Sequence, residues 1–312
     1  MTLSAPAISV ILVPGPRVEE AQRVLDALAA QSAADRLELV LVEVVPAAAS
    51  LSLPAVGGII RLQSAETRSW GHARAMGVRA AQAPIVAFLE DHCYPAPRWA
   101  EALIEAHRNP WDAAGYAFTC ANPDNWFTRS TFLYEYGAWA VPQAEGPRPA
   151  LASNNISYQR AFLLALGDEL DDLLEVDFIL HERCRAGGGI TMGLAGGAQV
   201  AHESFRSAAN LLRGVYRYAR HLAAFRARLL GWSRSRRALA GLAAFAVLPL
   251  LKPYRLGRAV LRQRAHRRAF LVALPLLLVA SAASAAGESL GYLLGDPPRG
   301  AHWTRRQFIP KD

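Results

Sequence analysis

The chain has 312 residues, and 52% of them are hydrophobic, which is enough to build the core of one large domain or two smaller ones. Its net charge of +8 is unevenly distributed, because sixteen of the 34 Lys and Arg residues lie between positions 204 and 287, where there is no Asp or Glu. The rest of the chain is acidic, with 18 basic and 26 acidic residues. Cys93, Cys120 and Cys184 form no CxxC pair, so they support neither a disulfide framework nor a zinc site, and we expect free thiols.

The basic segment indicates a membrane surface as partner rather than nucleic acid. Its charges alternate with two apolar runs, residues 238–251 and 269–286, and not with base-reading motifs. The first run has fourteen residues, fewer than the roughly 20 that a spanning helix needs, and its two basic flanks both favour the cytoplasmic side. We therefore expect a re-entrant or interfacial helix there, beside anionic headgroups. The second run is expected either to lie similarly or to span.

Strand and helix patterns alternate through the first two thirds of the chain, which predicts an α/β sheet with helices on its faces. The expected strands are residues 8–13, 37–45, 58–62 and 85–89, and the expected helices are residues 18–31, 71–82, 99–108 and 177–186. Residues 109–149 are irregular and aromatic, so we expect a substrate-facing insertion there rather than another sheet unit. The apolar stretch at residues 8–13 is too short for a signal peptide, so the first domain is expected in the cytoplasm.

Acidic side chains follow two of the expected strands, at the edge where open α/β sheets bind ligands. Glu43 follows Val42, and the strand at residues 85–89 ends in Glu90, Asp91 and His92. Oxygen and imidazole donors on one tight turn could hold Mn²⁺ or Mg²⁺. From these three residues alone, a solvated acidic turn is an equally good interpretation.

The segment from Arg68 to Trp99 resembles membrane-associated bacterial glycosyltransferases of family 2 around their DxD motif. The resemblance is carried by Ala-Arg-Ala-Met-Gly at residues 73–77, Phe-Leu-Glu-Asp-His at 88–92 and Pro-Ala-Pro-Arg-Trp at 95–99. It implies a GT-A fold, a Rossmann-like mixed α/β sheet flanked by helices, here with C-terminal membrane-associated helices. We expect the GT-A domain over residues 1–230 and the basic, apolar helical region over residues 231–312.

The resemblance also implies roles for individual residues. Asp177 would be the catalytic base, with Glu175 as its backup, because Asp177, Arg183 and Gly188 match the spacing of the family's Glu-Asp, Arg and Gly segment. The remaining implied sets are the donor-binding residues Glu43, Arg74, Glu90 and Asp91, the metal ligands Glu90, His92 and His202, and the acceptor-side residues Trp99, Asn154, Asn155 and Arg160.

Each of these residues has an ordinary structural interpretation beside the functional one. Asp177 suits a helix N-cap, Arg74 a helix surface, and the Asn pair a turn. A lone histidine such as His202 is more often structural than a ligand. The sequence also departs from the family pattern, with His92 in place of Asp, Val176 in place of Glu and Ala75 in place of Asn.

The implied activity is inverting transfer of a sugar from a nucleotide-diphosphate-sugar donor to a glycan or lipid-linked acceptor, with a divalent metal, at the cytoplasmic face of the inner membrane. Polysaccharide biosynthesis is the expected setting. The alternative is a catalytically inactive, membrane-docked nucleotide-sugar-binding or scaffold protein, which the departures at His92, Val176 and Ala75 favour. A nucleotidyltransferase would share the sheet, but the sequence has no Gly-rich phosphate loop. We expect no nucleic-acid partner.

Overall fold

The computed structural model describes residues 5–45, 48, 50–63, 67 and 69–296. Its elements fall into two compact units, one from residues 1–119 and 141–202 and the other from residues 120–140 and 203–312. The domain boundary predicted after residue 230 falls at the end of the helix Ala208–Leu229, which belongs to the second unit. That boundary stays a prediction. Arg68, where the family resemblance begins, and residues 297–312 of the predicted C-terminal region lie outside the described residues.

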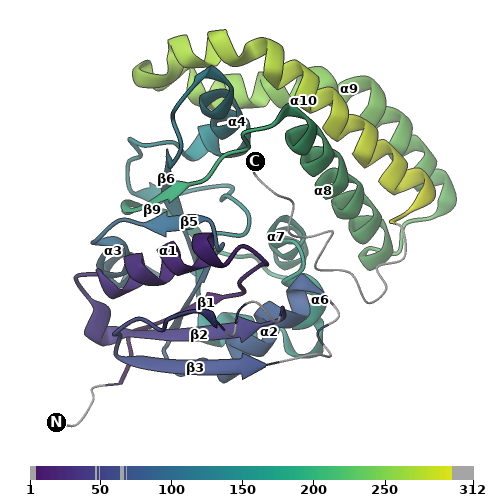
Figure 1. Cartoon of the computed structure of the whole chain (residues 1–312). Coiled ribbons are helices and arrows are strands. Elements are labelled where there is room, and N and C mark those ends of the chain that lie inside the picture. The colour runs from purple at the N-terminus through teal and green to yellow at the C-terminus, as the bar shows by residue number, and fades with distance from the viewer. Residues whose placement is uncertain (1–4, 46–47, 49, 64–66, 68, 297–312) are drawn as a thin grey trace. The chain divides into compact units, whose positions relative to one another are not determined.

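The first unit holds a mixed sheet and the helices that cover it (Figure 1). The strands are β1 (Ile8–Leu12), β2 (Leu37–Glu43), β3 (Gly58–Gln63), β4 (Ile85–Leu89), β5 (Cys93–Pro95), β6 (Ala113–Cys120), β7 (Gly146–Pro147), β8 (Ile156–Gln159) and β9 (Met192–His202). The helices are α1 (Val18–Ala29), α2 (Trp70–Ala80), α3 (Trp99–Ala106), α5 (Arg160–Leu164), α6 (Leu170–Leu173) and α7 (Asp177–Ala186).

The sheet combines a parallel half and an antiparallel half, in the order β3-β2-β1-β4-β8-β6-β9-β5, with β7 paired to β9. Strands β1 to β4 run parallel, whereas β8 is antiparallel to both β4 and β6. Every residue of β1, β2 and β4 is buried, as expected for parallel strands with both faces covered, while β3 at the edge is partly exposed at alternate positions. The mixed α/β fold predicted from the sequence is confirmed.

The register of the parallel strands brings their carboxyl ends to one edge. Leu12 at the end of β1 pairs with Leu41 of β2 and with Leu89 of β4. The loops that follow β1 and β4 also meet, because the backbone N–H of Gly15 donates to Oδ2 of Asp91 at 2.7 Å. Glu43 at the end of β2 and the acidic residues after β4 therefore lie at the ligand-binding edge of the sheet.

The expectation that residues 109–149 add no unit to the sheet is wrong. Strand β6 lies inside the sheet between β8 and β9, and Tyr116 on it donates its hydroxyl to the Phe88 carbonyl oxygen of β4 at 3.1 Å. Its first six residues are all buried. Four of its eight residues are Ala or Gly, which have low β-propensity, so the local pattern signals a strand only weakly.

The second unit is helical and contains α4 (Trp126–Tyr136), α8 (Ala208–Leu229), α9 (Arg234–Val260) and α10 (Arg267–Leu294). Helix α10 packs against α4, α8 and α9. The two apolar runs of the sequence lie inside α9 and α10, and these helices are longer than the runs, with 27 and 28 residues. By length and hydropathy, Arg234–Val260 and Arg264–Leu294 each qualify as a candidate membrane span.

We expect Gly71→Ala to destabilise the first unit, because α2 begins in direct contact with the α6–α7 segment. A Cβ at Gly71 would lie 2.1 Å from the Asp171 carbonyl oxygen and 2.6 Å from the Glu175 nitrogen, and backbone atoms cannot move aside cheaply. Overpacking of this kind lowers the free energy of unfolding by about 1–3 kcal/mol. Urea denaturation of both proteins measures the difference.

The matched control is Gly58→Ala in β3, where the nearest atom to an added Cβ is the Glu38 Cγ at 3.8 Å. That variant should unfold close to the wild-type midpoint. Equal midpoints for the two variants would contradict the packing argument at Gly71.

Candidate active site

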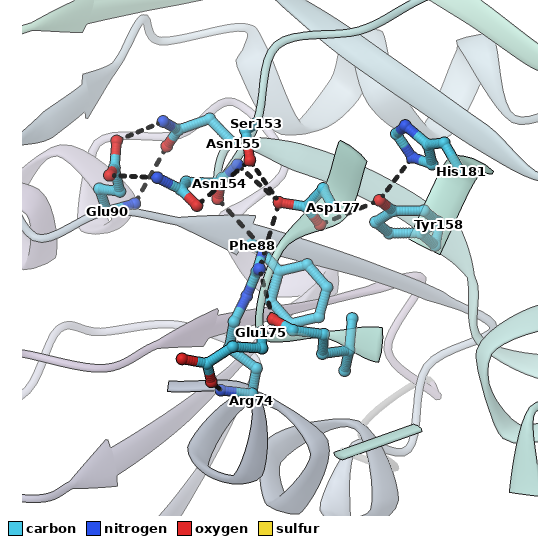
Figure 2. A network of polar contacts seen from close by, with 12 residues as sticks. Arg74, Phe88, Glu90, Ser153, Asn154, Asn155, Tyr158, Glu175, Asp177 and His181 are labelled. Carbon is cyan, nitrogen blue, oxygen red and sulfur yellow. Dashed lines mark hydrogen bonds and ion pairs between the residues drawn. The ribbon is translucent and has the colours of Figure 1, made fainter. Parts of the chain in front are cut away.

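Asp177 lies at the centre of a buried polar network (Figure 2). It is the first residue of α7, and its side chain has no exposed surface. Its Oδ2 accepts from the Asn154 backbone N–H at 2.7 Å, and from the Ser153 hydroxyl and Arg74 Nη1 at 3.2 Å each. Its Oδ1 accepts from the Tyr158 hydroxyl at 3.1 Å. Both carboxylate oxygens are thus engaged by the protein itself.

Arg74 is the cation that faces this carboxylate. It lies on α2 and is almost fully buried, with its guanidinium 3.9 Å from the centre of the Phe88 ring. It also donates to the carbonyl oxygens of Leu174 at 3.1 Å and Asn154 at 3.4 Å. A guanidinium stacked on an aromatic ring and bonded to two carbonyls is held in place, so Arg74 is a fixed charge rather than a surface side chain.

The balance of burial and charge keeps Asp177 ionised. Burial alone raises the pKa of Asp177, but the charge of Arg74 and the surrounding donors outweigh it, and the net pKa lies below the ordinary 3.8. Burial lowers the pKa of His181 to about 4, so His181 is neutral at pH 7. The Tyr158 hydroxyl has one hydrogen, which it donates to Asp177. His181 Nε2 lies 2.9 Å from the same hydroxyl oxygen, so Nε2 carries a hydrogen and donates it to that oxygen.

Two consecutive asparagines connect Asp177 to Glu90, the residue that follows β4. The Asn154 side-chain amide donates to Glu90 Oε1 at 3.0 Å, and the Asn155 amide donates to Oε2 at 2.6 Å. The Glu90 backbone N–H returns a bond to Asn155 Oδ1 at 3.0 Å. Asn154 has φ of 71°, a left-handed conformation that Asn tolerates better than most residues. Asn154 therefore contacts both carboxylates, and Asn155 adds two further bonds to Glu90.

Donor atoms of three further side chains surround Glu90 Oε2. Cys93 Sγ lies 3.7 Å from it, His202 Nε2 3.8 Å and His92 Nε2 3.9 Å. Ligand atoms of Glu90, Cys93 and His202 all lie within 4.8 Å of one another, and so do those of Glu20, Asp91 and His92 in a neighbouring group. Either group has the composition of a divalent metal site.

The predicted metal ligands are thus divided between two groups. Glu90 and His202 belong to the first and His92 to the second, where His92 Nδ1 contacts Asp91 Oδ1 at 2.8 Å. Sequence reasoning missed Cys93 and Glu20 as members of these groups. The Cys93–His202 neighbourhood comes from the antiparallel pairing of β5 with β9, which joins residues far apart in the sequence and leaves no local signal.

The other predicted residues have different surroundings. Glu43 pairs with Arg61 of β3 at 2.5 Å, and Glu175 accepts from the Gly71 backbone N–H at 2.7 Å. Trp99 is fully buried on α3, edge-on to Tyr116 at 5.4 Å between ring centres. Arg160 donates to the carbonyl oxygens of residues 78 and 79. The structure therefore joins Arg74, Glu90, Asn154, Asn155 and Asp177, and places Trp99 and Arg160 outside that network.

Comparison with known proteins gives one family and several structural neighbours. The sequence model of glycosyl transferase family 2 matches residues 18–160. The structure is similar to the mannosyltransferase PcManGT from Pyrobaculum calidifontis, solved in complex with GDP-Man and Mn²⁺, with a TM-score of 0.50, 16% identity, and coverage of 89% of this chain and 86% of that one. At that identity the likeness concerns the fold.

Two further solved structures have lower scores. They are GalNAc-T7 with UDP, GalNAc and Mn²⁺ (TM-score 0.45, 13% identity, 64% of this chain and 44% of that chain) and S. aureus TarS 1-349 (TM-score 0.42, 14% identity, 92% and 90%). No curated protein matches the sequence.

We expect Arg74→Met to destabilise the protein most at neutral pH. Without the cation, an ionised carboxylate stays buried, and breaking a buried pair in this way costs about 3–5 kcal/mol. Desolvation then raises the pKa of Asp177 above its unfolded value, so the deficit shrinks as pH falls and Asp177 becomes protonated. Thermal unfolding of wild type and variant between pH 5 and pH 8 measures the trend.

The matched control is Arg79→Met on the same helix, since Arg79 pairs with Asp171 at the partly exposed surface. Such pairs contribute about 0–1 kcal/mol. A deficit for Arg74→Met that is independent of pH would show that Asp177 is not the group that Arg74 keeps ionised.

Proposed function

We propose that the chain moves a sugar from a nucleotide-diphosphate-sugar donor to an acceptor hydroxyl by inverting single displacement, with Asp177 as the base, because the sequence model of glycosyl transferase family 2 matches residues 18–160. The observation that carries the proposal is the link from Asp177 through Asn154 to Glu90, which Asn155 also holds by a hydrogen bond. This link joins Asp177, whose carboxylate stays ionised, to Glu90, whose carboxylate lies at the ligand-binding edge of the sheet.

In the proposed reaction the acceptor oxygen attacks the anomeric carbon while the bond from that carbon to the diphosphate oxygen breaks. The electron pair of the broken bond leaves with the nucleoside diphosphate, and the acceptor proton passes to the Asp177 carboxylate. A positioned base of this kind contributes about 10²–10⁴-fold to the rate. Arg74 keeps the carboxylate in the form that can accept a proton, and Asn154 fixes its orientation.

A divalent cation fits the residues present. Glu90 offers a carboxylate oxygen and His202 an imidazole nitrogen, and their candidate ligand atoms lie close enough to share one ion. When bound there, the ion would stabilise the negative charge that develops on the leaving nucleoside diphosphate. The presence of GDP-Man and Mn²⁺ in the P. calidifontis mannosyltransferase supports both a nucleotide-sugar donor and a metal.

One observation favours the alternative of a nucleotide-sugar-binding protein without catalysis. Asp177 is completely buried, and its two oxygens accept from four groups of the protein. For Asp177 to act as a base, an acceptor hydroxyl must replace one of these donors. The Ser153 hydroxyl is the best candidate for replacement, because it is a neutral donor at 3.2 Å on a partly exposed residue.

We further propose that the protein works at the cytoplasmic face of the inner membrane on a lipid-linked or polysaccharide acceptor. Helix α9 supports this placement, because large apolar side chains along it are exposed, among them Leu239, Leu242, Phe245, Leu250 and Tyr254. Exposed apolar patches of this kind mark interaction sites. The basic residues at 255, 258, 262 and 264 are suited to anionic headgroups.

We expect Asp177→Asn to reduce transfer strongly, and thermal unfolding of the variant accompanies the assay because the substitution leaves the Arg74 cation buried without its carboxylate partner. The amide is isosteric but cannot take up a proton, so kcat should fall about 10²–10⁴-fold with little change in donor affinity. A panel of UDP-, GDP- and dTDP-sugars with Mn²⁺ or Mg²⁺, read as release of nucleoside diphosphate, provides the measurement and also identifies the donor class.

Asp171→Asn is the control, since Asp171 lies at the surface in a pair with Arg79. Glu175→Gln tests the backup base. If a donor binds wild type but none is turned over with any acceptor supplied, the binding-protein alternative replaces the enzyme. Equal rates for wild type and Asp177→Asn would remove Asp177 from the mechanism.

For the membrane proposal we expect the purified protein to float with vesicles that contain phosphatidylglycerol, and less with neutral phosphatidylcholine vesicles. High salt should weaken the anionic preference, because surface charges are screened. The double variant Leu242→Ser with Phe245→Ser should float less, and Leu53→Ser, an exposed leucine of the first unit, should behave as wild type. Equal recovery with both lipids would contradict a role for the basic residues.

A further inference from the structure

Cys93 adds a thiol to the turn after β4, where Glu90 and Asp91 supply carboxylates. It is the first residue of β5 and is fully buried. Its Sγ lies 3.7 Å from Glu90 Oε2, on the same carboxylate oxygen that His202 Nε2 approaches at 3.8 Å. A thiol, an imidazole and a carboxylate therefore converge on one small volume, and their ligand atoms lie within 4.8 Å of one another.

The pairing of two strands holds this arrangement in place. In the antiparallel pairing of β5 with β9, Cys93 lies directly opposite His202. His202 is also buried, so neither residue owes its position to a mobile loop. Glu90 in turn is fixed by the amides of Asn154 and Asn155. Each of the three side chains is thus positioned by backbone pairing or by hydrogen bonds.

The distances suit a tetrahedral ion. Bonds of about 2.0–2.3 Å from a metal to oxygen, nitrogen and sulfur place neighbouring ligands about 3.3–3.5 Å apart. The separations of 3.7 Å and 3.8 Å from Glu90 Oε2 exceed these values by a few tenths of an ångström. Small rotations of the side chains are enough to close that gap around an ion.

The composition of the set discriminates between metals. Mg²⁺ takes oxygen ligands in octahedral geometry and keeps several waters. Thiolate and imidazole favour divalent transition ions, whose affinity for such sites rises from Mn²⁺ through Fe²⁺ to Co²⁺. A site with only one carboxylate and two softer donors is therefore poorly suited to Mg²⁺.

We propose that Cys93 is a ligand of the ion in this site, together with Glu90 and His202, and that the site takes Co²⁺ or Zn²⁺ in preference to Mg²⁺. This assignment rests on the proposed function for the ion's role in catalysis, but its test does not. On binding, the metal–sulfur bond forms, the thiol proton passes to the buffer, and no electron is transferred. The neighbouring group of Glu20, Asp91 and His92 contains no sulfur, which makes the two sites separable by spectroscopy.

The experiment is a Co²⁺ titration of the full chain after removal of metal with a chelator. A cobalt–thiolate bond gives a near-ultraviolet charge-transfer band, and tetrahedral Co²⁺ gives strong visible bands. We expect both in wild type, and we expect Cys93→Ser to lose the charge-transfer band and bind Co²⁺ at least tenfold more weakly. Cys184→Ser, on α7 in the same unit, should keep the band. A large excess of Mg²⁺ should not displace the bound Co²⁺ from wild type.

A second variant keeps the test decisive if Cys93→Ser fails to fold, which thermal unfolding of the metal-free proteins will reveal. His202→Gln should weaken Co²⁺ binding while retaining the cobalt–thiolate band. Three results would each overturn the assignment. In the first, wild type binds Co²⁺ without showing the charge-transfer band, and in the second, the band persists in Cys93→Ser. In the third, Mg²⁺ readily displaces Co²⁺ from wild type. Sugar transfer that proceeds in Mg²⁺ equally well with Cys93→Ser would overturn it too, while leaving the proposed function standing. A cobalt–thiolate band in a protein that turns over no donor would instead count against the proposed function alone.

Discussion

The buried ion pair between Arg74 and Asp177 is the interaction on which the site depends. Removing two charges from water costs several kcal/mol for each ion, and only good geometry with additional hydrogen bonds offsets that penalty. Here Asp177 has four donors, and Arg74 adds two carbonyl acceptors and the face of Phe88. These contacts come from α2, from the loop before β8 and from the segment that leads into α7. A displacement of any of these segments would leave a charge buried and unpaired, so the ion pair holds all three in one arrangement.

Asn154 extends this constraint to the edge of the sheet. Its backbone N–H is committed to Asp177, and its side chain is committed to Glu90. The left-handed backbone at this residue lets both groups of one residue reach carboxylates on different elements, and Asn accepts that conformation at low cost. The proposed base and the proposed metal ligand are therefore coupled through one residue. The sequence resemblance assigned Asn154 and Asn155 to the acceptor side, and that assignment stays a prediction; within the chain their side chains contact Glu90.

Local sequence patterns predicted the parallel half of the sheet well, and the physical reason is burial on both faces. Strands such as β1, β2 and β4 appear in the sequence as continuous apolar runs, and the acidic turn after β4 follows from the abrupt end of such a run. Strand β6 was missed because half of its residues are Ala or Gly, which have low β-propensity, and its partners β8 and β9 are distant in the sequence. Arg74 was expected on a helix surface as readily as in a site, because a helical pattern does not show which face meets Asp177. The missed strand and the open alternatives at Arg74 share one cause, which is that contacts between residues far apart in the sequence leave no local signal.

The same cause explains why the departure at His92 is a poor guide to whether a metal site survives. Judged by position in the motif, His92 replaces a carboxylate, and the replacement favours loss of the ion. In space, His92 contacts Asp91 within the group that includes Glu20, whereas its neighbour Cys93 pairs across the sheet with His202. His92 Nε2 also lies 3.9 Å from Glu90 Oε2, so His92 and Cys93 both bring a donor atom near that carboxylate. In the proposed assignment, the ligand lies one residue after the departing motif position, and its donor atom is sulfur instead of oxygen. Which donors meet Glu90 in this chain depends on the register of β5 against β9, and motif identity alone does not decide it.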